Sequence, residues 1–591
     1  MKLISRSPAG LVAALAAVSL GACSSSSDDP NQPAEPTVQL EFTPASVTFG
    51  EDRSRAVELA NTGDEAAGPV ELVALAVTDA GGNEVPGASL SVSPSEVATL
   101  NAGVSRALTL TLDVPGSVGS GDYDVDLEAR VGGEAEASLG TSFSVVQDPG
   151  PVIETLEITG GAPQARQGEV LSFAVSATDD QGQPVNDPMV TWRAEPAFAG
   201  LTTAGGEYVG YSVGTARIIA EAGGAADTVE VDVTSRDAPS GSFQVAWHEP
   251  VELRYTSDHW EHGDVAYTGT WGCRAVPGGQ CGNTLYVWDI TVRTAPVLTD
   301  SIQVDARVVN DVKVRADGTL AIITHESSND GLNGITLLDL TDPLQPTVIT
   351  RFAAPDLSPG VHNVWIEGDY AYLVVDGAVP SSGLRVLDIS DPANPLIVAS
   401  FYGGGSFLHD VYVRDGLAFL SHWTTGLIIL DVGNGVAGGS PTSPVEVSRI
   451  AVPGYDVHNA WYWPEAGYVF LGDEIAVPGR VLVIDVNDLS APTQAASFTL
   501  AGAAPHNFWV DEDAGIAYFS WYENGIHAVD VSGRLLGELD KQARQVASIQ
   551  YDVGGACIAP SGTCSWAPQL HDGLIYVSDL NSGLWVLQPT F

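Results

Sequence analysis

Short apolar stretches that alternate with polar positions run through the chain, and from residue 241 onward they recur in a regular order. Period-two alternation and short apolar runs bounded by Gly, Asp, Asn and Pro are typical of β-strands. The clearest recurring element is an apolar run that ends in Asp, as in "LYVWDI" and "VLVIDV". Its copies end at Asp289, Asp339, Asp388, Asp431, Asp485 and Asp530, and a degenerate copy, "LWVLQ", closes the chain. The sequence therefore predicts an all-β protein.

The spacing of these copies predicts the architecture of residues 241–591. The copies lie roughly 45–60 residues apart with about four predicted strands in each unit, which is typical of propeller blades. The last unit ends before a fourth strand, and "SFQVAWHEP" from Ser242 has the fourth-strand pattern. We expect this segment to complete the last blade and to close a seven-bladed β-propeller, which removes an open sheet edge.

Two segments with alternating patterns precede this block. Residues 37–147 contain short predicted strands such as "RALTLTLDV" and "YDVDLEARV", and residues 151–236 contain "VLSFAVSATDDQGQPVND" and "GTARIIAEAGGAADTVEVDV". Both segments predict β-sandwiches. In the second, Trp192 is the expected core aromatic. Asp179 and Asp180 favour a hairpin turn over a calcium loop, because the alternating ligand spacing of calcium loops is missing.

The first residues have the features of a targeting segment. Lys2 and Arg6 precede an apolar run over 10–20, which is too short to span a bilayer. The run ends in "LGAC", which resembles the lipobox of bacterial lipoproteins and implies removal of residues 1–22 and lipid on Cys23. An ordinary secretory signal with a chance Cys is the alternative. Residues 23–36 are then a polar tether, and Ser24 favours the outer membrane or cell surface as the location.

Charge and cysteine content restrict the class of partner and the compartment. The chain has 24 Lys and Arg against 74 Asp and Glu, a formal net charge of −50. Such a surface repels phosphate backbones, so nucleic acid is not an expected partner, and it would attract divalent cations only weakly. Apart from Cys23, the cysteines form two local pairs, Cys273 with Cys281 and Cys557 with Cys564. These pairs favour disulfides over zinc, because neither has C-x-x-C spacing.

Each unit of the predicted propeller opens its first strand with a pair of mostly polar residues. The pairs are Ser257-Asp258, Asn310-Asp311, His362-Asn363, His409-Asp410, His458-Asn459, His506-Asn507 and Trp566-Ala567. The first strand of a blade is innermost, and adjacent residues of a strand point to opposite faces. We therefore expect one polar ring at a single level of the central channel, with one member of each pair facing the blade before and the other the blade after.

Two roles for this ring stay open. Hydrogen bonds that tie neighbouring blades together are favoured by the recurrence of the pair in unit after unit. A cation or small-ligand site is the alternative, since imidazoles with carboxylates suit a transition metal. The metal is less favoured, because His residues on four of seven blades would spread the ligands too widely for one ion.

The ends of the second strands differ from unit to unit but stay polar or aromatic. The candidates are Trp271, Glu326, Asp376, His422, Trp423, Glu474, Trp521, Glu523 and Asp579. A binding mouth needs such a varied set, with aromatic rings for stacking and carboxylates for hydrogen bonds, and packing at loop bases is the alternative.

Catalytic signatures are missing from the sequence. It contains no G-x-S-x-G, H-E-x-x-H, P-loop or dinucleotide fingerprint, and no cofactor is expected. A carboxylate pair for glycoside chemistry could come from Glu326, Asp376, Glu474 and Glu523, but any acidic propeller offers as many.

The block 241–591 resembles the LVIVD-repeat family of bacterial surface propellers, on motifs such as "VLVID", "LRVLD", "SFLHDVYVRDGLAFLSHW" and "WAPQLHDGLIYVSDLNSGLWVL". This resemblance implies a β-propeller but no reaction. Residues 37–147 resemble an Ig-like module, and 151–236 resemble the bacterial Ig-like group 2 domain. We expect a lipid-anchored stalk of two Ig-like domains and a propeller head that binds a glycan or a protein. An extracellular polysaccharide hydrolase or lyase and a structural envelope component are the alternatives.

Overall fold

The computed structural model describes residues 2–3, 37–49, 53–115, 118–146, 152–237, 240–375, 377, 382–475, 477–552 and 556–591. Over these residues the chain consists of β-strands and three short 3₁₀ turns, which confirms the all-β prediction. The turns are η1 (Ala197–Ala199), η2 (Pro355–Leu357) and η3 (Leu539–Lys541). Cys23, the tether and Asp376 lie outside the described residues, as does the predicted signal segment apart from residues 2–3. In the described parts of the chain, no helix is long and apolar enough to cross a membrane.

The chain divides into two compact units, Met1–Val152 and Ile153–Phe591. In the first unit, one sheet has the strand order β2 (Leu40–Thr43), β4 (Ser54–Asn61), β9 (Ser105–Asp113), β7 (Ser89–Ser93). The other sheet contains β1 (Lys2–Leu3), β3 (Ser46–Phe49), β5 (Val70–Ala74), β6 (Thr78–Asp79), β8 (Glu96–Val97), β10 (Gly121–Val131) and β11 (Glu134–Val146). Alternate positions of both sheets, among them Leu59, Leu110 and Leu127, meet in one core. The two sheets thus enclose a core as a sandwich does.

The second unit begins with another pair of sheets. One has the order β12 (Ile153–Gly160), β14 (Val170–Asp179), β17 (Glu207–Gly210), β16 (Gly200–Thr202). The other has the order β13 (Gln164–Arg166), β19 (Ala225–Thr234), β18 (Gly214–Ala222), β15 (Thr191–Glu195). Trp192 packs against their shared core, with its ring 6.3 Å from that of Phe173, as expected. Asp179 accepts hydrogen bonds from the backbone of Gln181 and Gln183, as a hairpin turn requires.

Seven further sheets follow in the described residues between 243 and 589. The first two are β21 (Tyr255–His262), β22 (Val265–Trp271), β23 (Thr284–Asp289), β24 (Val297–Gln303), and β25 (Val312–Val314), β26 (Leu320–His325), β27 (Gly334–Asp339), β28 (Thr347–Ala353). The next two are β29 (Val361–Glu367), β30 (Tyr370–Val375), β31 (Gly383–Asp388), β32 (Leu396–Phe401), and β33 (Asp410–Arg414), β34 (Leu417–His422), β35 (Gly426–Asp431), β36 (Val445–Ile450).

The fifth sheet contains β37 (Val457–Trp463), β38 (Tyr468–Asp473), β39 (Gly479–Asp485), β40 (Thr493–Leu500) and β44 (Gly537–Glu538). The sixth contains β41 (Phe508–Asp511), β42 (Ile516–Ser520), β43 (Ile526–Asp530) and β45 (Gln545–Ile549). The seventh combines β46 (Ser565–His571), β47 (Leu574–Asp579) and β48 (Gly583–Pro589) with β20 (Phe243–Glu249). Strand β20 pairs antiparallel with β48, which confirms that the segment from Ser242 completes the last sheet.

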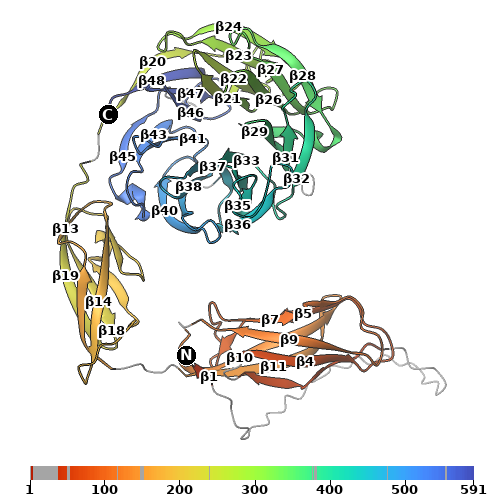
Figure 1. The fold of residues 1–591 in the computed structure, drawn as a ribbon, viewed down its shortest axis with the longest axis vertical. Helices are drawn as coiled ribbons and strands as arrows, with labels where there is room; N and C mark the ends of the chain where they lie inside the picture. Colours follow the sequence, from red (N-terminus) through yellow and green to blue (C-terminus); the bar gives the residue numbers. More distant parts are fainter. Residues whose placement is uncertain are drawn as a thin grey trace. The chain divides into compact units, whose positions relative to one another are not determined.

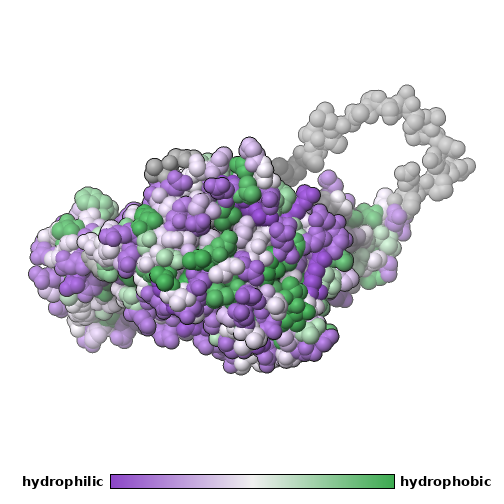
Figure 2. Space-filling model, turned by 90° about the horizontal axis from the view of Figure 1, so that it is seen from above, coloured by the Kyte–Doolittle hydropathy of each residue, from purple (hydrophilic) through white to green (hydrophobic). Residues whose placement is uncertain are grey.

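The first strands of these sheets lie next to one another around a common centre (Figure 1). Contacts run in order from β21 through β25, β29, β33, β37, β41 and β46, and β46 in turn contacts β21. The second and third strands of each sheet are largely buried, whereas the outermost strands are partly exposed. On the face shown in Figure 2, small hydrophobic areas lie among hydrophilic residues. This propeller-like order brings the first residues of all seven inner strands to one place.

The Asp residues that define the repeat end the third strands, as predicted, and each organises the turn that follows. Asp289 Oδ1 accepts hydrogen bonds from the backbone and hydroxyl of Thr291. The same arrangement recurs at Asp339, Asp388, Asp485 and Asp530. Asx turns of this kind satisfy backbone donors that the sheet leaves unpaired, so the recurrence of Asp is structural.

Both predicted cysteine pairs form disulfides, Cys273–Cys281 and Cys557–Cys564. They close short loops that lie after β22 and before β46. The second sandwich also contacts the sixth sheet, because Arg236 Nη2 pairs with Asp530 Oδ2 at 2.7 Å.

Candidate functional site

Three of the polar pairs lie in β-bulges of the inner strands. In β29, the pairing passes from Val361↔Val375 to Val364↔Leu373, so that His362 and Asn363 together lie opposite one residue. The register shifts in the same way in β21 and in β37. A bulge interrupts the alternation of side chains, so the two members of a pair need not face opposite ways. The imidazoles of the pairs contact one another, as do the amides and carboxylates, and we call these two sets the upper and the lower level of the ring.

The upper level is a row of neighbouring imidazoles whose planes are tilted against one another. Ring centroids lie 4.7 Å apart between His362 and His409, 4.3 Å between His409 and His458, and 4.2 Å between His458 and His506. His409 Nδ1 lies 3.1 Å from the backbone oxygen of His458, and His506 Nδ1 lies 2.7 Å from that of Trp566. A carbonyl only accepts, so Nδ1 carries the hydrogen in both rings. Each of these hydrogen bonds joins two neighbouring sheets.

Three imidazoles of this level, those of His409, His458 and His506, are neutral at physiological pH. Burial, with a smaller contribution from neighbouring imidazoles, lowers the pKa of His458 and of His506 to about 3. The same two causes hold the pKa of His409 well below its usual value. His362 differs from the others, because its Nδ1 lies 2.7 Å from Glu326 Oε1.

The lower level is a chain of amides and carboxylates. Asn310 Nδ2 donates to Asn363 Oδ1 at 2.9 Å, and Asn363 Nδ2 donates to Asp410 Oδ1 at 2.8 Å. Asn459 Nδ2 lies 3.5 Å from Asn507 Oδ1. These contacts also cross from one sheet to the next, which is the geometry that the blade-tying interpretation requires.

The buried ammonium group of Lys313 lies among three carboxyl groups at this level, those of Asp258, Asp311 and Asp410. Lys313 Nζ lies 3.1 Å from Asp258 Oδ2 and 2.5 Å from Asp311 Oδ1. Burial raises the pKa of Asp311 to about 6 and that of Asp410 to about 7. Burial acts the same way on Asp258, but Lys313 and the neighbouring imidazole outweigh it and lower the pKa of this carboxyl overall. The four groups line a cavity of about 70 Å³, room for a few water molecules.

A closed collar of aromatic rings lies below the carboxylates. It consists of Trp260, Trp365, Tyr412, Trp461 and Trp509. Consecutive ring centroids are 6.0, 4.5, 5.2 and 4.8 Å apart, and Trp509 returns to Trp260 at 6.2 Å. Sequence reasoning missed this collar. Its signal is an aromatic residue two positions after the polar pair in five of the seven units, with Lys313 and Gln569 in the other two.

Four side chains from the ends of second strands surround the imidazoles. Glu326 contacts His362, and Glu474 Oε2 lies 3.8 Å from His458 Nε2. The ring of Trp423 lies 5.2 Å from His409, and the ring of Tyr522 lies 5.1 Å from His506. Trp271 continues this rim, with its ring 6.2 Å from Trp566. The predicted mouth residues Trp271, Glu326, Trp423 and Glu474 are therefore brought together here, and Tyr522 joins them.

Two stretches of the chain, residues 360–402 and 408–452, match the LVIVD repeat. Each match spans one sheet, the first from β29 to β32 and the second from β33 to β36. The chain contains LVIVD repeats. No curated protein sequence matches it. Among solved structures, the C-terminal WD40 domain of Sif2 is similar over 74% of this chain and 99% of that chain, with 14% identity and a TM-score of 0.38.

Three predicted mouth residues are buried and do not belong to the rim. Trp521 has no exposed surface and donates from Nε1 to the carbonyl of Ala503. Asp579 is likewise inaccessible and accepts hydrogen bonds from the amide of Cys564 and the hydroxyl of Tyr551. His422 is 2% exposed. At these strand ends the side chain turns into the sheet, and the sequence does not distinguish this from a turn toward the mouth.

Two other candidates have separate outcomes. Glu523 is half-buried and accepts a hydrogen bond from the amide of Cys557, so it holds a disulfide loop rather than the imidazoles. Asp376 lies outside the described residues.

Proposed function

We propose that the seven sheets between residues 243 and 589 form a seven-bladed β-propeller of LVIVD repeats, and that this propeller binds a glycan at the imidazole end of its channel. In this proposal the chain is a lipid-anchored surface protein, Cys23 carries the lipid, and the two sandwiches are Ig-like stalk domains. The "LGAC" sequence supports the anchor, and the order of contacts from β21 to β46 and back supports the ring of blades.

The observation that carries this proposal is the composition of the rim. Trp271, Trp423 and Tyr522 offer half-buried aromatic rings, and Glu326 and Glu474 offer carboxylates between them. Sugar rings present apolar faces that stack on aromatic side chains and hydroxyls that hydrogen-bond to carboxylates. The alternation of the two kinds of side chain around one opening suits such a ligand.

The backbone of the rim gives a second argument. Trp423 and Tyr522 have φ angles of 36° and 37°, in the left-handed region that residues with a side chain seldom adopt. Such strain persists only where the surrounding structure enforces it, and it clusters at ligand sites. Trp423 directly follows β34, and Tyr522 lies two residues after the end of β42. The turn after each of these second strands directs the ring to the rim.

A glycan array probed with the full chain tests the proposal. We expect binding to a restricted set of glycans, and we expect Trp423→Ala and Trp271→Ala each to weaken it at least tenfold. Phe198→Ala is the matched control, because Phe198 is an aromatic residue of the second sandwich with 73% of its surface exposed. Melting curves establish that each variant folds. An array without any bound glycan, or equal loss in the Phe198 variant, would contradict the proposal, and capture of a protein alone would favour a protein partner.

A further inference from the structure

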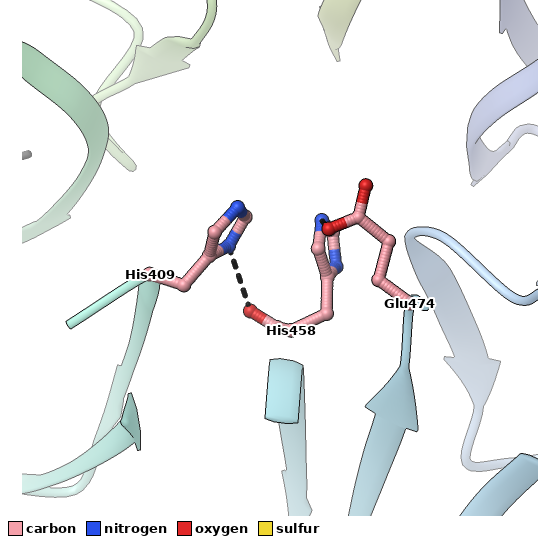
Figure 3. Close-up of side chains that lie close together, drawn as sticks. All are labelled: His409, His458 and Glu474. Carbon is pink, nitrogen blue, oxygen red and sulfur yellow. Dashed lines mark hydrogen bonds and ion pairs between the residues drawn. The ribbon is translucent and has the colours of Figure 1, made fainter. Parts of the chain in front are cut away.

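Three side chains of the mouth converge closely enough to share one ion. One potential ligand atom from each of His409, His458 and Glu474 lies within 4.8 Å of the other two (Figure 3). We propose that these three residues bind a divalent transition-metal ion. The expectation that the His residues spread too widely for one ion holds for the whole ring, but it does not hold for this adjacent pair with its carboxylate.

The distances fit a small ion. His458 Nε2 lies 3.8 Å from Glu474 Oε2, and the His409 and His458 ring centroids lie 4.3 Å apart. Two ligands of a tetrahedral zinc ion, each about 2.1 Å from the metal, are roughly 3.4 Å apart. A shift of a few tenths of an ångström in the carboxylate closes the difference between the observed and the ideal separation of this pair. The observed separation is also too long for a hydrogen bond, so this contact leaves both atoms available.

The buried ring of His458 has unused ligand capacity. Only 2% of this residue is exposed, and its Nδ1 has no hydrogen-bond partner. The ion would take Nε2, the nitrogen that faces Glu474, because one imidazole cannot bind the same ion through both of its nitrogens. The unpaired Nδ1 shows only that no protein hydrogen bond at this atom fixes the tautomer of the ring.

The two other ligand residues are oriented by hydrogen bonds to neighbouring groups, as metal ligands usually are. His409 donates from Nδ1 to the backbone oxygen of His458, which fixes the tautomer and leaves the Nε2 lone pair for an ion. Tyr522 donates its hydroxyl to Glu474 Oε1 at 2.5 Å, which fixes the carboxylate. Three neighbouring sheets thus take part, with His409 from the fourth, His458 and Glu474 from the fifth, and Tyr522 from the sixth.

The ligand set selects the class of metal. Two imidazoles and one carboxylate suit zinc, iron, copper or nickel, whereas calcium and magnesium prefer oxygen ligands throughout. Three protein ligands leave at least one coordination position open on the side of the mouth. The inference does not rest on glycan binding, because an ion can occupy the site in the absence of any glycan.

Titration of the chelator-treated full chain with Zn²⁺ tests the proposal, with visible absorption of bound Co²⁺ as a second readout. We expect one saturable ion per chain and at least tenfold weaker binding in His458→Gln and in Glu474→Gln. His571→Gln is the matched control, because His571 bonds the carbonyl of Gly263 and is part of no such ligand cluster among the described residues.

Two results would overturn the proposal. The first is the absence of saturable Zn²⁺ and Co²⁺ binding, and the second is binding that Glu474→Gln and His458→Gln leave unchanged. If the His458 variant does not fold, Glu474→Gln and His409→Gln give the same test, since their side chains are only partly buried. A protein that binds no metal but still binds a glycan would contradict this proposal alone. A protein that binds metal but no glycan would contradict the proposed function alone.

Discussion

His409 donates a hydrogen bond from Nδ1 to the backbone oxygen of His458, 3.1 Å away, across the boundary between two sheets. The same ring presents its other nitrogen toward the mouth, next to Glu474 (Figure 3). One imidazole therefore ties two sheets together and also lies in the rim where we propose that a ligand binds. The two roles of the repeated pair that the sequence leaves open are compatible.

Replacement of Lys313 by Met is expected to destabilise the protein more at high pH than at low pH. Without this cation, Asp258 and Asp311 both stay buried with no cation beside them, so the pKa of Asp311 rises further above its unfolded value and the pKa of Asp258 loses the partner that holds it low and rises as well. A raised folded-state pKa means that stability is lost as pH rises through it, whereas both carboxyls are protonated at lower pH. Urea unfolding should show a loss of about 3 kcal/mol at pH 8 and a clearly smaller one at pH 5.

The matched control for this variant is Lys541→Met. Lys541 is exposed, pairs with Glu538 on the surface and lies 5.8 Å from the ring centroid of Tyr211, so its removal should change the unfolding free energy little at either pH. An equal loss for Lys313→Met at pH 5 and pH 8 would show that Lys313 acts through packing rather than charge.

Asn363→Ala is expected to weaken the link between three sheets. Its amide accepts from Asn310 and donates to Asp410, and both partners are left buried when it is removed. The unfolding free energy should fall by about 1–3 kcal/mol. Asn394→Ala removes an exposed amide that contacts only Asp391 and should have a much smaller effect. Indistinguishable losses would contradict the role of the lower level in joining sheets.

Asp431→Asn tests the strongest of the turn-forming aspartates. Asp431 is buried and accepts hydrogen bonds from the backbone of Gly433, Gly435, Ala437 and Gly439. Burial would raise the pKa of this carboxyl, but these amides hold it well below the usual value. Its contribution to stability is therefore present above the unfolded-state pKa and lost as pH falls below it.

We expect Asp431→Asn to lower the unfolding free energy by about 1–3 kcal/mol at pH 7 and by less at pH 3. Asp485→Asn is the control, because Asp485 holds only Asn487 and is less buried. A larger loss in the control, or a loss in Asp431→Asn that grows toward acid pH, would contradict this account.

The strand pattern predicts the fold well because the residues that define it act locally. Asp289 and its counterparts end a strand and organise the next turn, so their spacing measures the repeat directly. The segment from Ser242 was recognisable as a missing fourth strand, and β20 does pair with β48. Both inferences need only the order of strands within one sheet.

The site was harder to predict because it depends on contacts between sheets. The bulge that places His362 and Asn363 together opposite one residue is a matter of register, which the sequence pattern does not carry. Trp423 and Trp521 both follow a second strand, yet one lies at the rim and the other is fully buried. The aromatic residues of the collar, such as Trp365 and Trp461, follow the polar pair at a fixed distance in the sequence. This position does not distinguish them from ordinary core residues, because apolar residues on an inner strand usually belong to the core.

Hydrogen exchange of the full chain with and without its strongest glycan ligand tests the central claim most directly, because it locates the bound ligand. We expect protection around His409, Trp423, Glu474 and Tyr522, at the imidazole end of the channel, and no change in the two sandwiches. Protection confined to the sandwiches or to outer strands such as β24 and β28 would contradict the account, because the ligand would then bind away from the mouth.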